Sequence, residues 1–141
     1  MKRLFVDSGV FFAAMHSARG YARDLFVLAG QEAVQLVVSD WVLQETRRNL
    51  AYSTPERADF FDYLVARLPL EIVTVTKRSV QAAAKRVVLK DAPVVAAARK
   101  AKVDALVTYD RKHLLGRPEV AKYVRAPIVT PDEAIQFLQS S

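Results

Sequence analysis

Five short apolar runs recur along the chain, and longer stretches with the features of helices separate most of them. The runs lie at residues 3–6, 35–38, 71–75, 105–108 and 127–129. Each is too short for a helix and is apolar on both faces, which is typical of strands buried inside a parallel sheet. The pattern therefore predicts five β-strands, each covered on both sides.

The stretches between these runs carry helix start signals. Ser39 and Asp40 are N-cap residues ahead of Trp41, and Thr130–Glu133 combines a cap, a proline and a glutamate that reaches back. Helices are expected over residues 10–15, 22–33, 41–52, 55–68, 77–87 and 92–102, with a last one after residue 130. Strands that alternate with helices predict an α/β fold, a three-layer sandwich with helices on both faces of a parallel sheet. Right-handed crossovers then put the carboxyl ends of the strands at one edge, where ligands bind in open sheets.

The composition fits one cytoplasmic domain that binds a polyanion. The 141 residues have the length of a single domain, and 52% of them are hydrophobic. The 21 Lys and Arg outnumber the 15 Asp and Glu, and the resulting charge of +6 favours nucleic acid as a partner. The chain has no cysteine, which excludes disulfides and thiolate metal sites, and no apolar stretch reaches the ~20 residues that span a bilayer. Asp7 interrupts the apolar N-terminal run, so no secretion signal is expected.

Four acidic residues fall where the strands are expected to end. Asp7 directly follows the first strand, and Asp110 lies two residues after the fourth. Asp91 begins the helix that leads into the fourth strand, and Glu45 lies on the helix after the second. At ~6 Å and an effective dielectric constant of ~20, each like-charged pair would cost on the order of 3 kcal/mol. A divalent cation compensates for this repulsion, and a set of oxygen ligands selects Mg²⁺ or Mn²⁺.

An acidic metal site of this kind predicts hydrolysis of phosphodiester bonds, because a bound cation activates water and neutralises charge on the phosphate. Each acid alone also has a simpler structural explanation. Asp7 and Asp91 would serve as N-caps, and Asp110 as a turn residue. Glu45 would pair with Arg48 on its own helix. What points to chemistry is that all of them occur at one edge of one sheet.

Segments that carry these acids follow one another in the order and spacing of a known family. They are Leu4-Phe-Val-Asp7-Ser8-Gly9-Val10, Val38-Ser-Asp-Trp-Val-Leu-Gln-Glu45, Lys90-Asp-Ala-Pro93 and Asp104-Ala-Leu-Val-Thr108-Tyr-Asp110-Arg-Lys-His-Leu-Leu115. With them the chain resembles the PIN-domain family of nucleases, in particular small prokaryotic members such as VapC-type toxins. The resemblance implies one PIN-like domain over residues 1–141, with a five-stranded parallel sheet in the order 3-2-1-4-5. It also implies dependence on Mg²⁺ or Mn²⁺ and cleavage of single-stranded RNA.

By position, the resemblance assigns an acidic set that binds metal and carries the catalysis: Asp7, Glu45, Asp91 and Asp110. Ser8 and Thr108 match hydroxyl positions that orient carboxylates or bound water. Gly9 stands where many members have Asn or Ser, which would loosen the first loop. Lys112 stands where some members have a further acid, which implies one bound ion rather than two. The expected partners are RNA, a cognate antitoxin and a second copy of the chain.

Other side chains suit nucleic-acid contacts or packing. The basic residues that could follow a phosphate backbone are Arg23, Arg47, Arg48, Arg111, Lys112 and Arg117, of which Arg111 and Lys112 adjoin Asp110. His113 could act as an acid or base but lies in an expected helical turn, and His16 is expected to be structural. Trp41 is expected in the core, and the apolar helix face at residues 60–64 fits either core packing or a dimer interface.

Three other functions are alternatives to a nuclease for a chain of this kind. A phosphoacceptor receiver domain needs an aspartate at the end of the third strand, where this chain has Thr76 and Lys77. A nucleotide-binding fold is disfavoured because no glycine-rich loop follows a strand. A catalytically weak or inactive PIN-fold module that binds RNA or a protein partner stays open, and metal-dependent cleavage separates it from the enzyme.

Overall fold

The computed structural model describes residues 1–140, and its centre is a five-stranded parallel sheet in the order β3-β2-β1-β4-β5. The strands are β1 (Arg3–Val6), β2 (Gln35–Ser39), β3 (Glu71–Val73), β4 (Ala105–Val107) and β5 (Ile128–Val129). The register pairs Leu4 with Leu36 on one side of β1 and with Ala105 on the other. The predicted α/β class and strand order are confirmed.

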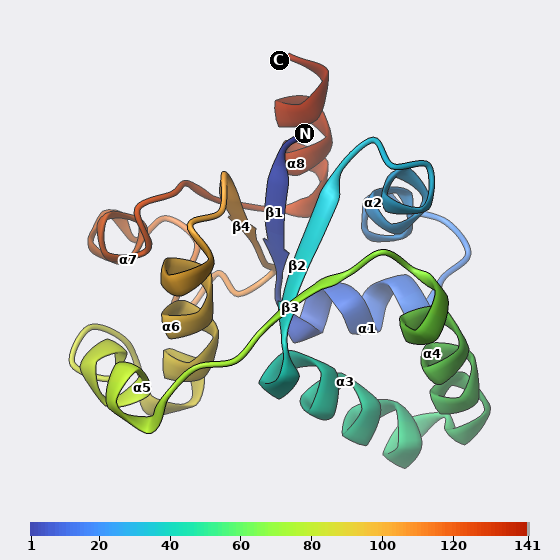
Figure 1. Ribbon diagram of the computed structural model, residues 1–141, viewed down its shortest axis with the longest axis horizontal. Helices are drawn as coiled ribbons and strands as arrows, with labels where there is room; N and C mark the ends of the chain where they lie inside the picture. Colours follow the sequence, from blue (N-terminus) through green and yellow to red (C-terminus); the bar gives the residue numbers. More distant parts are fainter. Residues whose placement is uncertain (141) are drawn as a thin grey trace.

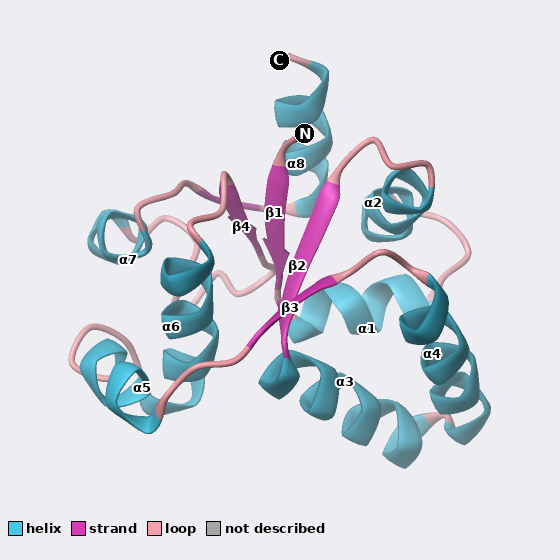
Figure 2. Ribbon diagram, in the orientation of Figure 1, coloured by secondary structure: helices cyan, strands magenta, loops and turns pink. Residues whose placement is uncertain are grey.

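Helices cover both faces of this sheet, as Figures 1 and 2 show. They are α1 (Ser8–His16), α2 (Tyr21–Gly30), α3 (Asp40–Ser53), α4 (Pro55–Arg67), α5 (Lys77–Ala83), α6 (Ala92–Ala101), α7 (Pro118–Val124) and α8 (Pro131–Gln139), with a 3₁₀ turn η1 at Leu89–Asp91. In Figure 1, α1, α2 and α4 lie to one side of the sheet, and α5, α6 and α7 lie to the other. The carboxyl ends of β1 and β2 meet at the lower edge of that view, where α1 and α3 begin.

The central strands are buried on both faces, but the edge strands are not. The side chains of β1 at Leu4, Phe5 and Val6 are fully buried. In contrast, Ile72 of β3 is 52% exposed, and Ile128 of β5 is only partly buried. The expectation that every strand is covered on both faces was therefore wrong for the edge strands β3 and β5. An edge strand has a neighbouring strand on one side only, and fewer helices pack against it.

Two helices end earlier than the sequence pattern predicts. The expected helix 22–33 ends at Gly30, where the positive φ of Glu32 (59°) and the bond from the Ala33 N–H to the Leu28 carbonyl close the helix. The expected helix 77–87 ends at Ala83, before Val87 and Val88, whose β-branched side chains disfavour a helix. The chain then enters η1, which delivers Asp91 to the edge of the sheet.

Sequence reasoning missed α7 and misplaced Trp41. The signal for α7 was Pro118 at the first helical turn, with Val120 and Val124 on its buried face. Trp41 is 37% exposed rather than in the core, because it is Val42 that faces the sheet. Among residues 1–140, no helix has the length and apolar character that a membrane crossing requires.

The apolar face at residues 60–64 belongs mainly to the core. Phe61 is buried and its ring lies 5.0 Å from that of Phe11, which in turn contacts Phe26 at 4.6 Å. Tyr63 is exposed, with the Arg67 guanidinium 3.6 Å from its ring centre. Core packing therefore accounts for Phe61, and the expected homodimer stays a prediction.

Candidate active site

Asp7 lies at the carboxyl end of β1, the central strand of the sheet. Its backbone N–H donates to the Val107 carbonyl at 3.1 Å, so strand pairing fixes its position. One carboxylate oxygen caps α1 by accepting from the Ser8 N–H at 2.7 Å. The other accepts from the hydroxyl of the buried Thr108 at 2.7 Å. The N-cap role considered for Asp7 is therefore real, and the second oxygen still faces the site.

Glu45 reaches the same edge from α3. That helix begins where the Ser39 hydroxyl accepts from the Val42 N–H at 3.1 Å, which sets the direction in which its first turns point. The Ser8 hydroxyl donates a hydrogen bond to Glu45 Oε1. Ser8 thus ties the carboxylate of α3 to the start of α1, as expected for a hydroxyl that orients an acid.

Asp91, Asp110 and His113 form the tightest group of potential ligands. One donor atom from each lies within 4.8 Å of the others. His113 Nδ1 is 3.4 Å from Asp91 Oδ2 and 3.7 Å from Asp110 Oδ2. Asp91 precedes α6, but its side chain makes no cap hydrogen bond, so the N-cap explanation does not account for this carboxylate. Asp7 and Glu45 are not members of this compact group.

Burial and the repulsion from neighbouring acids raise the pKa values of two acids of the site, Asp7 and Asp91. Burial raises the pKa of Asp7, with smaller contributions from the charges of Glu45 and Asp91, although the hydrogen bonds from Thr108 and Ser8 oppose this rise. Burial also raises the pKa of Asp91, and the Asp110 charge adds to the effect. The four acids predicted from the sequence therefore lie close enough to influence one another, as a site for a cation requires.

Two buried polar atoms support a cation more directly. Within residues 1–140, Asp91 Oδ2 and His113 Nδ1 are buried side-chain atoms without a hydrogen-bond partner. A buried polar atom left unpaired costs about 1–3 kcal/mol, so its persistence needs an explanation. Carboxylate oxygens and imidazole nitrogens are common ligands of divalent cations. Asp91, Asp110 and His113 therefore fit such an ion.

Comparison with known proteins adds a family to this geometry. The family model described as "PIN domain" matches residues 3–112, which is most of the chain. The chain belongs to the PIN-domain family. This is a family of nucleases, and the resemblance seen in the sequence is thereby confirmed. No curated protein matches the chain significantly.

Solved structures with the same fold share little sequence with this PIN domain. VapC20 of Mycobacterium tuberculosis superposes with a TM-score of 0.61 at 18% identity, over 77% of this chain and 91% of that one. VapBC2 of Rickettsia felis gives a TM-score of 0.63 at 13% identity, over 91% and 98%. FitAcB of Neisseria gonorrhoeae gives 0.58 at 13% identity, over 91% and 97%. At these identities the likeness shows the fold.

His113 is the residue whose contact with the acids the sequence did not predict. The expected turn is present, because Asp110 Oδ1 accepts from the backbone N–H groups of Lys112 at 3.0 Å and His113 at 2.9 Å. The turn role considered for Asp110 is therefore also real. Its spacing was the available signal: a turn capped by an aspartate returns the third following residue to that aspartate. Asp91, the other neighbour of His113, could not be paired with it from sequence alone.

Three of the six basic residues considered for RNA make hydrogen bonds within the PIN domain. Arg23 donates to the Ala14 carbonyl at 2.7 Å, and Arg47 forms a two-pronged ion pair with Asp62. Arg117 donates to the Lys112 carbonyl at 2.7 Å and so braces the turn that carries His113. Arg111 and Lys112 are exposed next to Asp110, and their contact with RNA stays a prediction.

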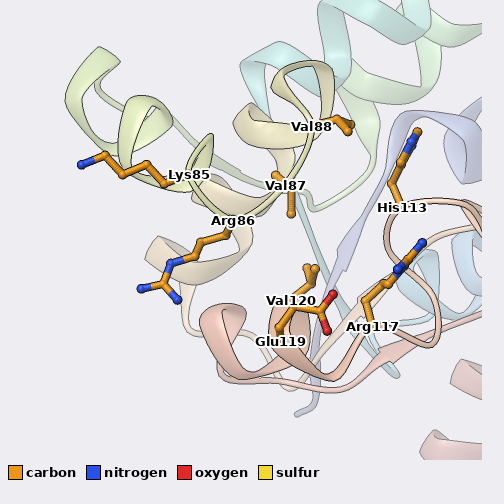
Figure 3. Close-up of a pocket in the computed structure, with 8 residues that line it drawn as sticks. All are labelled: Lys85, Arg86, Val87, Val88, His113, Arg117, Glu119 and Val120. Atoms are coloured by element: carbon orange, nitrogen blue, oxygen red, sulfur yellow. The ribbon is translucent and has the colours of Figure 1, made fainter.

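A hollow of about 430 Å³ opens beside His113. Figure 3 shows His113 and Arg117 next to each other on one side of it, whereas Lys85 and Arg86 extend outward on the other. The hollow is lined by Lys85, Arg86, Val87, Val88, His113, Arg117, Glu119 and Val120.

Gly9 lies in the first turn of α1 and not in a loop, so the expected loosening of a first loop does not apply.

Replacing Thr108 by valine should weaken both stability and activity. The Thr108 hydroxyl donates to Asp7 Oδ2 and accepts from the Asp110 N–H at 3.1 Å, so valine leaves two polar groups without this partner. We expect a loss of about 1–3 kcal/mol in the free energy of unfolding and a 10–100-fold loss of activity, as for other residues that orient ligands. Urea denaturation and RNA cleavage rates measure the two effects. Thr108→Ser, which keeps the hydroxyl, should retain most of the activity; equal losses in both variants would contradict the orienting role.

Proposed function

We propose that this PIN domain is a divalent-metal-dependent endoribonuclease that cleaves single-stranded RNA. The observation that carries the proposal is the convergence of Asp7, Glu45, Asp91 and Asp110 at one edge of the sheet. Within this set, the charges of Glu45 and Asp91 act on Asp7, and the charge of Asp110 acts on Asp91. A protein that used these acids only as caps and turn residues would have no reason to hold them this close together.

Asp7, Asp91 and Asp110 are the proposed metal ligands, with Glu45 a ligand or a residue that positions water. A divalent cation, when bound, supplies a reactive water at neutral pH and neutralises charge that develops on the phosphate. Two of these acids are held by hydrogen bonds within the chain: Thr108 holds Asp7, and backbone N–H groups hold Asp110. These two acids are therefore already positioned before a substrate arrives, which lowers the entropic cost of the reaction.

Glu45 is the proposed acceptor for the proton of the attacking water. Its Oε1 is held by the Ser8 hydroxyl, so the carboxylate is restrained while its second oxygen can accept a proton. Water adds to phosphorus, the bond from phosphorus to one ribose oxygen breaks, and that oxygen takes a proton from solvent. Arg111 and Lys112, exposed beside Asp110, would contact the phosphate backbone.

We also infer that the protein is the toxin of a toxin–antitoxin pair. VapC20 of Mycobacterium tuberculosis is described as a toxin that cleaves the sarcin–ricin loop. VapBC2 of Rickettsia felis was solved bound to a DNA fragment from its promoter, and FitAB bound to the IR36 DNA fragment. By analogy, a cognate antitoxin is the expected protein partner here, together with a second copy of the chain. A short reading frame for a DNA-binding antitoxin immediately upstream of the gene would support this inference.

The test of the enzyme is cleavage of an end-labelled single-stranded RNA by the purified protein. Fragments should form with Mg²⁺ or Mn²⁺ and should be absent in excess EDTA, because without a cation no water is activated and the charge on the phosphate is not neutralised. Internal fragments would identify an endonuclease, and a duplex of the same sequence should be cut more slowly. RNA binding without cleavage at any metal concentration would replace the enzyme by a non-catalytic PIN-fold binding module.

A further inference from the structure

His113 brings a nitrogen donor to a site whose other candidate ligands are oxygens. Its Nδ1 faces Asp91 Oδ2 at 3.4 Å and Asp110 Oδ2 at 3.7 Å, too far for a good hydrogen bond in either case. Asp91 Oδ2 and His113 Nδ1 are both buried and unpartnered among residues 1–140. Asp91 Oδ2 and His113 Nδ1 face each other without a hydrogen bond, so a metal ion that both can coordinate would satisfy both atoms.

The turn that carries His113 is held in place from several sides. The backbone N–H of His113 donates to Asp110 Oδ1, so the ring and the second oxygen of Asp110 belong to one closed turn. The next residue, Leu114, is fully buried and anchors that turn in the core. Arg117 donates to the Lys112 carbonyl from the other end of the turn. The side chain of His113 is only 22% exposed, so most of it lies inside the site.

The distances fit shared coordination of one cation. Ligand atoms bind such ions at about 2.0–2.2 Å, so two atoms on the same ion are at most about 4.4 Å apart and closer when adjacent. The separations from Nδ1 to the two carboxylate oxygens fall inside this limit. Asp110 keeps Oδ2 for the site because its Oδ1 is already engaged by two backbone N–H groups.

We propose that His113 is a metal ligand, and that its imidazole makes the site select Mn²⁺ over Mg²⁺. Mg²⁺ dehydrates reluctantly and prefers oxygen ligands. Mn²⁺ is a transition metal and tolerates one imidazole among carboxylates better than Mg²⁺ does, although it is the weakest binder of its series. The inference rests on the proposed metal-dependent function and deepens it, because it names the ligand that decides which metal is bound. A histidine that served only as a counter-charge for Asp91 and Asp110 would not contact the ion.

The test reads the Mn²⁺–nitrogen bond directly by electron spin echo envelope modulation of Mn²⁺ bound to the protein. A directly coordinated imidazole gives a ¹⁴N modulation, and labelling with ¹⁵N-histidine shifts its frequencies in the wild-type protein without any mutation. The chain has two histidines, so His16 supplies a matched control. His16 Nδ1 lies 3.3 Å from the Phe12 carbonyl and its Nε2 lies 3.2 Å from the Thr54 hydroxyl, away from the acids.

In the affinity measurement, His113→Gln is compared with His16→Gln by titration with Mn²⁺ and with Mg²⁺. We expect His113→Gln to lose the ¹⁴N signal and to bind Mn²⁺ about 10–100-fold more weakly, while Mg²⁺ affinity changes by less than about 3-fold. His16→Gln should match the wild type in both metals. Circular dichroism checks that each variant is folded, and the isotope experiment on the wild type decides the question if His113→Gln is not.

The outcomes separate this inference from the proposed function. Mn²⁺ binding with no histidine nitrogen coupling in the wild type would overturn the role of His113 while leaving the acidic metal site intact. Equal losses of Mn²⁺ and Mg²⁺ affinity in folded His113→Gln would overturn the selectivity. Absence of binding by either metal to the wild type would overturn both this inference and the metal dependence proposed above.

Discussion

Asp7→Asn and Asp91→Asn are each expected to reduce the rate of metal-dependent RNA cleavage by about a hundredfold to a thousandfold or more. Each substitution should also make the metal-free protein more stable. Both carboxyl groups have a pKa raised by burial and by neighbouring acids, so their charged forms are unfavourable in the fold. Asparagine removes the charge and keeps one oxygen, which at residue 7 can still cap α1, although its amide nitrogen cannot accept the hydrogen bond from Thr108. The expected rise in melting temperature is roughly 2–4 °C, which corresponds to about 1 kcal/mol for a chain of this size.

The stability difference should depend on pH with a definite sign. Because the folded-state pKa of Asp7 lies above its ordinary value of 3.8, the folded protein binds this proton more tightly than the unfolded chain does. The metal-free wild type therefore loses stability relative to Asp7→Asn as the pH rises from that ordinary value through the raised one. Above this window the full difference remains, and below it the difference disappears. Thermal melts from acidic to neutral pH in EDTA measure it.

A matched control is Asp24→Asn, which removes the charge of an exposed aspartate on α2. It should leave both cleavage and the shape of the pH profile unchanged. Normal cleavage by folded Asp7→Asn or Asp91→Asn would show that the acidic set has been wrongly identified. A melting temperature well below that of the wild type in EDTA would instead show that the carboxylates stabilise the fold without a metal.

Addition of Mg²⁺ or Mn²⁺ is expected to stabilise the wild-type protein strongly against unfolding. A ligand that binds only the folded state raises the free energy of unfolding by about 2.7 kcal/mol at a concentration of 100 times its dissociation constant. Burial raises the pKa values of Asp7 and Asp91, and the metal would cancel the repulsion from neighbouring acids that adds to this rise. Melting temperatures in EDTA and at increasing metal concentrations measure the effect, and EDTA added afterwards should reverse it.

The effect of metal must depend on the acids if they are its ligands. In Asp91→Asn the increase in melting temperature should shrink to a small fraction of the wild-type value, whereas Asp24→Asn should show the full increase. An equal increase in all three proteins would place the stabilising ion elsewhere. No increase in the wild type at millimolar metal would contradict a tightly bound ion.

How much of the site could be predicted follows from which interactions are local in sequence. The acids at the ends of β1 and β4 could be placed because apolar runs identify buried strands, and parallel strands end at one edge. The hydroxyls of Ser8 and Thr108 could be assigned only through the family resemblance, and the structure shows the contacts that they make with Glu45 and Asp7. Helix ends were less predictable, since α5 ends at Ala83, before the β-branched Val87 and Val88 that disfavour a helix.

Neighbouring residues are enough to specify the succession of strands and helices along the chain and the placement of acids at the strand ends, because hydrophobic periodicity is a local property. Which side chains face each other across the edge of the sheet depends on how distant elements pack. His113 meets Asp91 because a turn capped by Asp110 and a helix start from another part of the chain converge there. Likewise, the exposure of Trp41 and Ile72 was decided by which elements pack beside them. Such contacts depend on distances between elements that are far apart in the chain, and no local pattern encodes these distances.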